Sequence, residues 1–329
     1  MPLSLQVDGK KWRSHLHSML ERHPGLVPVI KGNGYGFGLE LLAAEASRLG
    51  VETVAVGLDS EIARVRSAFS GEIILLSPDL IENEISDGSV IQTISSLASL
   101  HEVDPMRPII LELVTPLHRH GISMSEFDHA IAMIEKRGLL SRGFALHLPI
   151  AKVDTTWLDG ALSKLPQGST VWISHLPNPD RVRNKFPNLH FRERIGTDLW
   201  LGDQTALEVR ATVLENRNIQ GAAGYRQRKV RGHVIVVSGG TAHGIGLVAP
   251  SGDRTLIGRL KLVGKAIESS LGRMRSPYIW NGRILDFLEP PHMQCSLLLS
   301  RGSNQPATGE ELKVRVRFTT TTFDQIIVR

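Results

Sequence analysis

The chain has 329 residues, of which 41% are hydrophobic and 22% charged, as in a soluble globular protein of one large or two medium domains. The net charge is +5 and the pI about 9.5, but lysine and arginine are interspersed with acidic residues and only 5% of residues are aromatic, so we predict no nucleic-acid partner. The single cysteine, Cys295, excludes an intrachain disulfide. The apolar runs are too short to cross a bilayer and the N-terminus lacks a signal-peptide pattern. Together these features predict a cytoplasmic protein with no membrane partner.

The first chemically distinctive segment is a lysine followed by a glycine-rich loop. The apolar run Val27–Ile30 ends at Lys31, and a loop with four glycines leads into an amphipathic stretch, which is the order strand, loop, helix. Burial at a strand end lowers the pKa of a lysine, and the free amine attacks aldehydes. The backbone N–H groups of the loop and the hydroxyl of Tyr35 suit an anion. The alternative is a solvent-facing lysine beside a flexible turn.

Strand-like and helix-like stretches alternate through the first 205 residues. The clearest helical pattern is Ser123–Arg137, in which Phe127, Ile131 and Ile134 recur at helical spacing. Eight strand–helix units in this length predict an α/β protein with a (β/α)8 TIM-like barrel, and a doubly wound open sheet is the alternative because periodicity cannot show closure. The eight runs centre on Val27–Ile30, Val51–Val56, Ile73–Leu76, Val90–Ile94, Pro108–Leu113, Gly143–Leu148, Thr170–Ser174 and Ile195–Leu201.

The pattern changes after residue 205. Runs such as His233–Val237, Ser296–Leu299 and Leu312–Phe318 resemble strands separated by Gly and Pro turns, and only Leu256–Gly272 has a helical pattern. We therefore predict a barrel domain over residues 8–205 and a smaller, mainly β domain over residues 206–329.

The loop resembles a known cofactor motif. Lys31-Gly-Asn-Gly-Tyr35-Gly-Phe-Gly38 is similar to the pyridoxal-phosphate (PLP) lysine motif of the alanine racemase family, which belongs to the fold type III PLP enzymes. The resemblance implies that Lys31 binds PLP covalently and that Tyr35 contacts its phosphate. It also implies a barrel followed by a β domain that the first residues join, with Leu3–Val7 as a strand there.

Further strand ends match the same family. The segment around Arg119 is similar to the family segment whose arginine lies near the cofactor's phenolic oxygen and the substrate carboxylate, a contact that suits a planar guanidinium. Glu112 falls where many members carry a carbamylated lysine that orients this arginine. If Glu112 is instead simply a buried acid, Arg119 is still its expected partner. His147 matches the family's strand-end histidine.

The last barrel motifs complete the resemblance. Asn178 lies in a segment that resembles the family's His-x-x-Asn-Ser, with Pro179 in place of the phosphate-binding serine, and His175 there is more simply a structural strand-end histidine. Arg194, Gly196 and Thr197 match the family's Arg-Pro-Gly-Ile. The resemblance implies phosphate binding by the backbone N–H groups of Gly196 and Thr197, and places Arg194 at the pyridine nitrogen, which favours racemases over the related decarboxylases.

The second domain lacks the family's catalytic tyrosine, so we identify the chain as a divergent member. Thr241 occupies the tyrosine position, and its hydroxyl is too weakly acidic to replace a phenol. Racemisation needs a proton removed from one face of Cα and delivered to the other, and Lys31 serves only one face. His243 is the nearby candidate for the second acid/base, against the simpler interpretation of a surface turn histidine, and Tyr225 is a weaker candidate.

Two further matches in this domain are partial. The resemblance implies that the Met293 backbone N–H meets the substrate carboxylate of the partner subunit, but Gln294 replaces the family's aspartate. Phe323 replaces a phosphate-binding tyrosine. With Pro179, this change removes two hydroxyl donors, each worth about 1 kcal/mol, which predicts weaker PLP binding.

We therefore predict a homodimeric, PLP-dependent, alanine-racemase-like isomerase that acts at Cα of a small-molecule amino acid with an altered second acid/base. The alternatives are one-base PLP chemistry without racemisation and a non-enzymatic, PLP-binding or regulatory role. We predict no metal site, because His118 and His120 have no acidic or thiol companions nearby.

Overall fold

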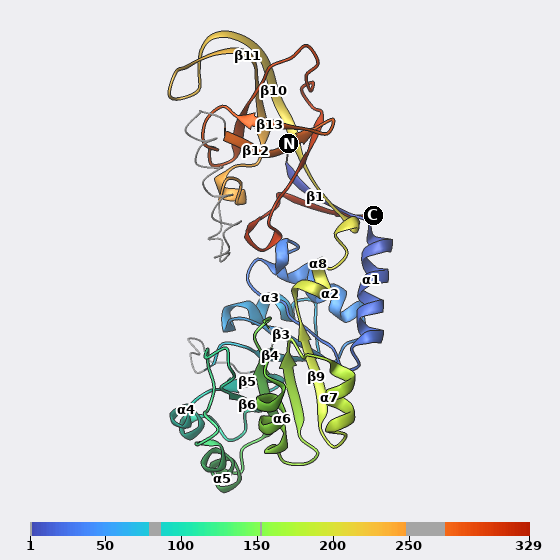
Figure 1. Cartoon of the computed structure of the whole chain (residues 1–329), viewed down its shortest axis with the longest axis vertical. Coiled ribbons are helices and arrows are strands. Elements are labelled where there is room, and N and C mark those ends of the chain that lie inside the picture. The colour runs from blue at the N-terminus through green and yellow to red at the C-terminus, as the bar shows by residue number, and fades with distance from the viewer. Residues whose placement is uncertain (1, 79–86, 152, 248–273) are drawn as a thin grey trace. The chain divides into compact units, whose positions relative to one another are not determined.

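The computed structural model describes residues 2–78, 87–151, 153–247 and 274–329 (Figure 1). The chain divides into two compact units: a barrel unit, residues 13–202, and a C-terminal unit, residues 1–12 together with 203–329. The helix expected at Leu256–Gly272 lies outside the described residues.

The barrel unit contains one sheet of eight parallel strands. Between the two end strands, Val29 and Ala55 form a parallel bridge, and the Ile30 N–H donates to the Ala55 carbonyl at 2.7 Å, so the sheet closes on itself. The (β/α)8 barrel is therefore confirmed and the open sheet is excluded. In sheet order the strands are β2 (Val27–Pro28), β9 (His190–Ile195), β8 (Thr170–Ser174), β7 (Ser141–His147), β6 (Ile109–Leu113), β5 (Val90–Ile94), β4 (Glu72–Leu75) and β3 (Thr53–Val56).

Two apolar layers hold this barrel together. One layer, contributed by residues on or next to successive strands, fills the interior and includes Val29, Ile74, Ile110 and Trp172. The second layer lies between the strands and the surrounding helices. The helices are α1 (Gly9–Arg22), which begins in the C-terminal unit, α2 (Leu39–Arg48), α3 (Ile62–Arg66), α4 (Leu97–Glu102), α5 (Phe127–Arg137), α6 (Thr155–Ser163), α7 (Pro179–Lys185) and α8 (Thr197–Leu201), with short 3-10 helices η1 (Gly34–Gly36) and η2 (Asp59–Glu61).

The eighth predicted strand was misplaced. We expected it at Ile195–Leu201, but the strand is β9, and most of the expected run forms α8. The apolar residues of the run are buried on that short helix, where the Trp200 indole N–H donates to the Val29 carbonyl at 2.8 Å. The true strand carries buried charges, and Glu193 is satisfied there by an ion pair with Arg183.

The C-terminal unit is built on one mainly antiparallel sheet. Six of its strands form a closed circuit of pairings, and β1 adds to β10 antiparallel and to β16 parallel. The strands are β1 (Leu3–Val7), β10 (Leu207–Ala223), β11 (Arg228–Ser238), β12 (Met274–Trp280), β13 (Arg283–Phe287), β14 (Cys295–Ser300), β15 (Glu311–Val314) and β16 (Gln325–Val328), with 3-10 helices η3 (Gln204–Ala206), η4 (Thr241–His243) and η5 (Phe318–Thr320).

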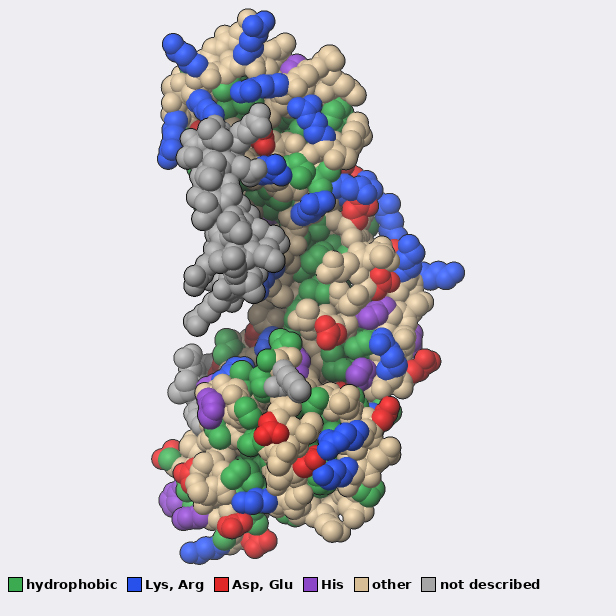
Figure 2. All heavy atoms as spheres, viewed as in Figure 1, with side chains coloured by type: hydrophobic (Ala, Val, Ile, Leu, Met, Phe, Trp, Pro, Cys, Tyr) green, Lys and Arg blue, Asp and Glu red, His purple; other side chains and the backbone are tan. Residues whose placement is uncertain are grey.

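The surface charge is uneven in one place. The hairpin of β10 and β11 exposes Arg217, Arg226, Arg228, Lys229 and Arg231, and Figure 2 shows lysine and arginine side chains gathered on this unit. Arg217 pairs with Glu215 there, whereas no acidic residue lies between Arg226 and Arg231 in the sequence. Within the part of the chain that the structure describes, no helix combines the length and apolar character needed to cross a bilayer.

Candidate active site at the barrel mouth

The loop after β2 has a backbone that depends on its glycines. Tyr35 has φ +54°, between Gly34 at +62° and Gly36 at +90°, so three successive residues lie in the left-handed region. A Cβ on Gly34 would lie 2.9 Å from the backbone nitrogen of Leu39, at the start of α2. Glycine at 34 therefore lets the loop turn tightly and direct Tyr35 inward, where its side chain is buried.

Lys31 lies at the mouth of the barrel. Its side chain is exposed rather than buried, which corrects the expectation from the strand pattern. Its pKa is nevertheless lowered, mainly by partial desolvation in the mouth and further by the positive charges of Arg119 and Arg194, while Glu61 opposes the shift. More of the amine is therefore in the free, nucleophilic form than for a lysine in water.

Tyr35 and Gly196 together shape a small cradle. A Cβ on Gly196 would lie 2.0 Å from the Tyr35 hydroxyl, so only glycine allows this approach. Burial, and secondarily the charge of Glu61, raises the pKa of Tyr35 to about 12, so the phenol stays protonated and can donate. Gly196 directly precedes α8, whose first residue is Thr197. The sequence-predicted phosphate contacts Tyr35, Gly196 and Thr197 thus lie at one place.

Arg194 is a buried cation in this mouth. It is 5% exposed, its Nη2 donates to the Leu146 carbonyl at 3.2 Å, and its Nε is buried without a hydrogen-bond partner in the described structure. Burial lowers its pKa, and the Glu112 carboxylate opposes this shift. The Glu112 carboxylate is therefore close enough to Arg194 to act on its charge, and the expected pairing of Glu112 with Arg119 stays a prediction. Arg119 lies on the exposed loop after β6.

His147 ends β7, and His175 directly follows β8. The pKa of His147 is lowered to about 4, first by burial and then by nearby cations, so the ring is neutral at physiological pH. Its centroid lies 5.8 Å from that of His175, whose φ is +59°. Asn178 is exposed and precedes α7, and Pro179 is the first residue of that helix. Proline suits this position because the first helical N–H needs no partner, so residue 179 starts a helix instead of offering a hydroxyl.

Glu61 is a site residue that sequence reasoning missed. Its buried carboxylate accepts hydrogen bonds from the N–H groups of Gly32 at 2.6 Å, Gly57 at 2.7 Å and Leu58 at 3.1 Å. It therefore joins the loop after β2 to the loop after β3, directly beside Lys31. The only signal in the sequence was an acid three residues after Leu58, a spacing typical of many helix starts.

The candidates of the C-terminal unit lie on a separate set of turns. His243 is buried; its Nδ1 accepts from the Gly240 N–H at 3.2 Å, and its Nε2 contacts Asp324 at 3.1 Å. Burial raises the pKa of Asp324, but hydrogen bonds from His243 and the Leu3 N–H outweigh that and lower it overall. Both ring nitrogens of His243 are thus engaged, which argues against its predicted role as acid/base and for a buried structural turn.

The turn at Thr241 packs against the segment that contains Met293. The Thr241 N–H donates to the His292 carbonyl at 2.7 Å, and the Ala242 N–H donates to the Met293 carbonyl at 2.9 Å. The Met293 side chain is 73% exposed. Phe323 stands where the family motif has a phosphate-binding tyrosine, and its ring centroid lies 6.1 Å from that of Phe318.

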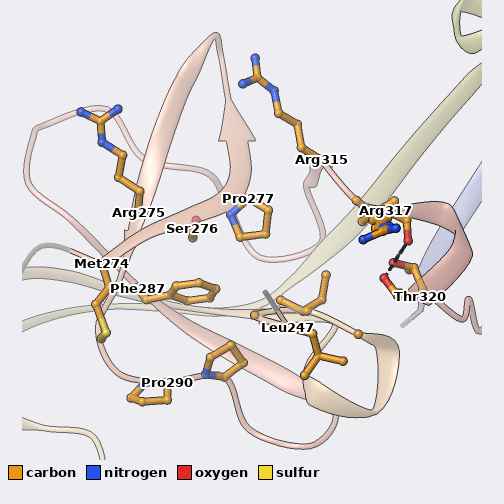
Figure 3. A pocket seen from close by; sticks show the side chains of 16 residues that line it. Leu247, Met274, Arg275, Ser276, Pro277, Phe287, Pro290, Arg315, Arg317 and Thr320 are labelled. Carbon is orange, nitrogen blue, oxygen red and sulfur yellow. Dashed lines mark hydrogen bonds between the residues drawn. The ribbon is translucent and has the colours of Figure 1, made fainter. Parts of the chain in front are cut away.

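A pocket of about 510 Å³ lies in the same unit (Figure 3). Its lining combines apolar side chains with Arg275, Arg315 and Arg317, and none of the described residues that line it is acidic. Arg275 and Arg315 extend to the same side in Figure 3. Pro290, on the wall of the pocket, lies two residues before His292. The positive lining suits a carboxylate or phosphate rather than a cation.

The sequence is similar to known proteins over its first half. Residues 7–165 match a family model described as the N-terminal domain of alanine racemase. The alanine racemase of Campylobacter curvus is 34% identical over 119 residues, 36% of this chain and 34% of that protein. That of Campylobacter jejuni subsp. jejuni is 29% identical over 150 residues, 45% of each chain. The matched segment thus spans between about a third and somewhat under half of these relatives.

Solved structures extend the similarity to the whole chain. Alanine racemase from Bartonella henselae, solved with covalently bound pyridoxal phosphate, has a TM-score of 0.72 at 16% identity and covers 100% of both chains. Alanine racemase from Bacillus anthracis, solved with bound L-Ala-P, has a TM-score of 0.70 at 16% identity and covers 99% of this chain and 87% of that one. At these identities the likeness is one of fold.

Proposed function

We propose that the chain is a member of the alanine racemase family that binds PLP at Lys31 and racemises or exchanges the Cα proton of an amino acid. The match of residues 7–165 to the family model and the likeness of fold support this proposal. The observation that carries this proposal is the cluster at the barrel mouth: an amine of lowered pKa beside guanidinium groups and an anion cradle.

The residues present fit the cofactor. The buried Nε of Arg194 has no partner in the described structure, which suits a donor aimed at a ring nitrogen. The close approach of the Tyr35 hydroxyl to Gly196 forms a cradle for a phosphate. Lys31 supplies the amine that an aldehyde requires. Asn178 and the neutral imidazole of His147 supply further polar groups at neighbouring strand ends.

The roles of the residues follow from their charges. Held by these residues, PLP would supply an electron-withdrawing ring for the charge that develops when a proton leaves Cα. Lys31, in its free amine form, takes and returns that proton on one face. Arg119 holds the substrate carboxylate, and Glu112 supports the guanidinium groups around it. Arg194 cannot give a full proton to the ring nitrogen, which keeps electron withdrawal weak and limits side reactions.

We also propose that the protein is a homodimer. The second domain carries the remaining substrate contact, the backbone N–H of Met293, whose side chain is exposed on the single chain. In this arrangement each substrate carboxylate is bound by Arg119 of one subunit and by residue 293 of the other.

A second function is favoured by specific residues. Thr241 has no acidic hydroxyl, and both ring nitrogens of His243 are engaged. With no second base, Lys31 would exchange protons on one face only, which is one-base chemistry, or the protein would bind PLP without turnover.

An absorbance scan and an isotope experiment separate these outcomes. Purified protein incubated with PLP should gain an absorbance band in the violet, and Lys31→Ala should lose it. A panel of L-amino acids in D2O, followed by chiral analysis, then distinguishes exchange with inversion from exchange with retention. Protein that gains no band with added PLP would refute the proposal.

A further inference from the structure

We propose that the exposed face of the β10–β11 hairpin binds duplex DNA in the major groove. The residues involved belong to the C-terminal unit alone, so this binding is independent of the chemistry proposed for the barrel mouth. The prediction of no nucleic-acid partner rested on the charge balance of the whole chain. The hairpin differs from that average, because residues 216–238 contain five lysine and arginine residues and no aspartate or glutamate.

The outer part of the hairpin, residues 219–232, is a ribbon of two strands (Figure 1). β11 pairs with β14 from Ser238 back to His233, whereas it pairs with β10 as far as Arg228. Among the described residues, no third strand pairs with this outer part. Neighbouring strands lie about 4.8 Å apart. The ribbon is therefore narrow enough for the major groove of B-DNA, which is about 12 Å wide and admits two strands.

One face of the ribbon is apolar and packs on its own unit. Ala223, Val230 and Val234 form a buried cluster with Leu288, which follows β13. Partly buried leucines of β14 pack against the same cluster. Because successive side chains of a strand point to opposite faces, this packing fixes the ribbon on one side and leaves its other side to the solvent.

The other face presents cations and an amide. Gln220 lies opposite Arg231 in the register, and Ala222 lies opposite Lys229. Residues that are directly opposite share a face, and all four are exposed. In the major groove, lysine and arginine hydrogen-bond guanine, and the glutamine amide hydrogen-bonds adenine. The exposed face therefore carries the side-chain types that read base edges.

The cations of the ribbon lack acidic partners. Arg217, nearer the base of the hairpin, pairs with Glu215, but no ion pair is found at Arg226, Lys229 or Arg231 among the described residues. Cations of this kind bind phosphates and release the counterions condensed on DNA. Charged side chains on exposed strands also prevent edge-to-edge pairing, but acidic residues would serve that purpose equally. The exclusively positive sign therefore favours a polyanion.

Two other polyanions fit this face less well. Segments that bind a lipid surface bury large apolar side chains in it, and the exposed face of the ribbon has none. Tyr225, at the turn, is 84% exposed but stacks on His292, with ring centroids 4.6 Å apart. Duplex RNA has a deep, narrow major groove that side chains cannot read. Duplex DNA is therefore the polyanion that the ribbon fits best.

Fluorescence anisotropy of a labelled DNA duplex of about 20 base pairs tests this binding, with the full chain at salt concentrations from about 50 to 200 mM. Contacts from Arg226, Lys229 and Arg231 predict a slope of log K against log salt of about −2.7, because each phosphate contact contributes about −0.9. A double variant with Lys229→Gln and Arg231→Gln should lower the steepness by about 1.8, which is about 60-fold weaker binding at about 0.1 M salt. The matched control, Lys10→Gln with Lys11→Gln, removes two exposed charges from the same unit and should bind like the unmodified protein.

Further measurements separate groove binding from general attraction. Gln220→Ala should leave the salt slope unchanged but reduce the preference between duplexes of different sequence. An unchanged Tm shows that each variant is folded, since the replaced side chains are exposed. The proposal is overturned if the unmodified protein does not bind the duplex, or if the double variant binds no more weakly than the control. It is also overturned if duplex RNA of the same sequence, or vesicles that contain phosphatidylserine, bind at least as tightly as the DNA.

Discussion

Removing the charge of Glu61 should loosen the Lys31 loop and make Lys31 less basic. The Glu61→Gln variant keeps the size of the side chain but replaces one acceptor oxygen with an NH2 group. The amide oxygen can still accept from Gly57 and Leu58, as Oε2 does now. The NH2 group would face the Gly32 N–H, which now donates to Oε1 at 2.6 Å, so two donors would meet.

The expected loss of stability is small but measurable. Leaving one buried donor unpaired costs about 1–3 kcal/mol. Gly32 is exposed and water can reach its N–H, so we expect the lower limit, about 1 kcal/mol. For a unit of this size that lowers Tm by roughly 2–4 °C. The second effect is electrostatic. The Glu61 carboxylate stabilises the Lys31 ammonium, so its removal lowers the pKa of Lys31 further.

The assay follows the free amine directly. Covalent capture of PLP, trapped by borohydride reduction and measured by mass spectrometry at a series of pH values, reports the fraction of Lys31 in the free form. In Glu61→Gln the midpoint should move to lower pH. Glu52→Gln is the matched control, because that carboxylate is 86% exposed and far weaker in its contacts. A midpoint that stays fixed or moves upward, with an unchanged Tm, would refute the role of Glu61.

Three further predictions concern the barrel mouth. Gly196→Ala should weaken PLP binding in an absorbance titration at least ~10-fold, about 1.4 kcal/mol, because its Cβ would lie 2.0 Å from the Tyr35 hydroxyl. The control Gly160→Ala, whose Cβ would meet nothing within 4 Å, should bind PLP normally, and equal affinities of the two variants would contradict the cradle. Arg194→Met should lower the free energy of unfolding in urea by about 3 kcal/mol, because the Glu112 carboxylate loses a nearby positive charge. Adding Glu112→Met should recover part of this loss, whereas additive losses would show that the two side chains are not coupled. The NMR titration of His147 in the cofactor-free protein should have its midpoint at about 4, and a value near 6.5 would show that the mouth is well solvated.

Most strands of the barrel could be predicted from the sequence, because each is a short run of apolar, often β-branched residues that is buried on both faces. The exception was β9, in which charged residues are buried. Glu193 is satisfied by Arg183 on α7, and the charge of Arg194 is partly offset by the Glu112 carboxylate on β6. Such tertiary partners cannot be seen in a local pattern. The apolar run that forms α8 was therefore predicted as the strand instead.

The grouping of the site residues was predictable for a related reason. The carboxyl ends of parallel strands meet at one end of a barrel, so Lys31, His147 and Arg194 had to be neighbours once the strands were recognised. Glu61 was missed, because its importance lies in backbone contacts between two loops that have no regular spacing.

The structure explains what Pro179 and Phe323 do at two positions where the sequence departs from the alanine racemase motifs. Pro179 starts α7, and Phe323 packs near Phe318, so both positions that lost a phosphate-binding hydroxyl now serve local folding. The anion contacts that remain are concentrated where Tyr35 meets Gly196, a geometry that no side chain larger than glycine permits. In the proposed cofactor site, anion binding would therefore depend on glycine at position 196 together with the Tyr35 hydroxyl.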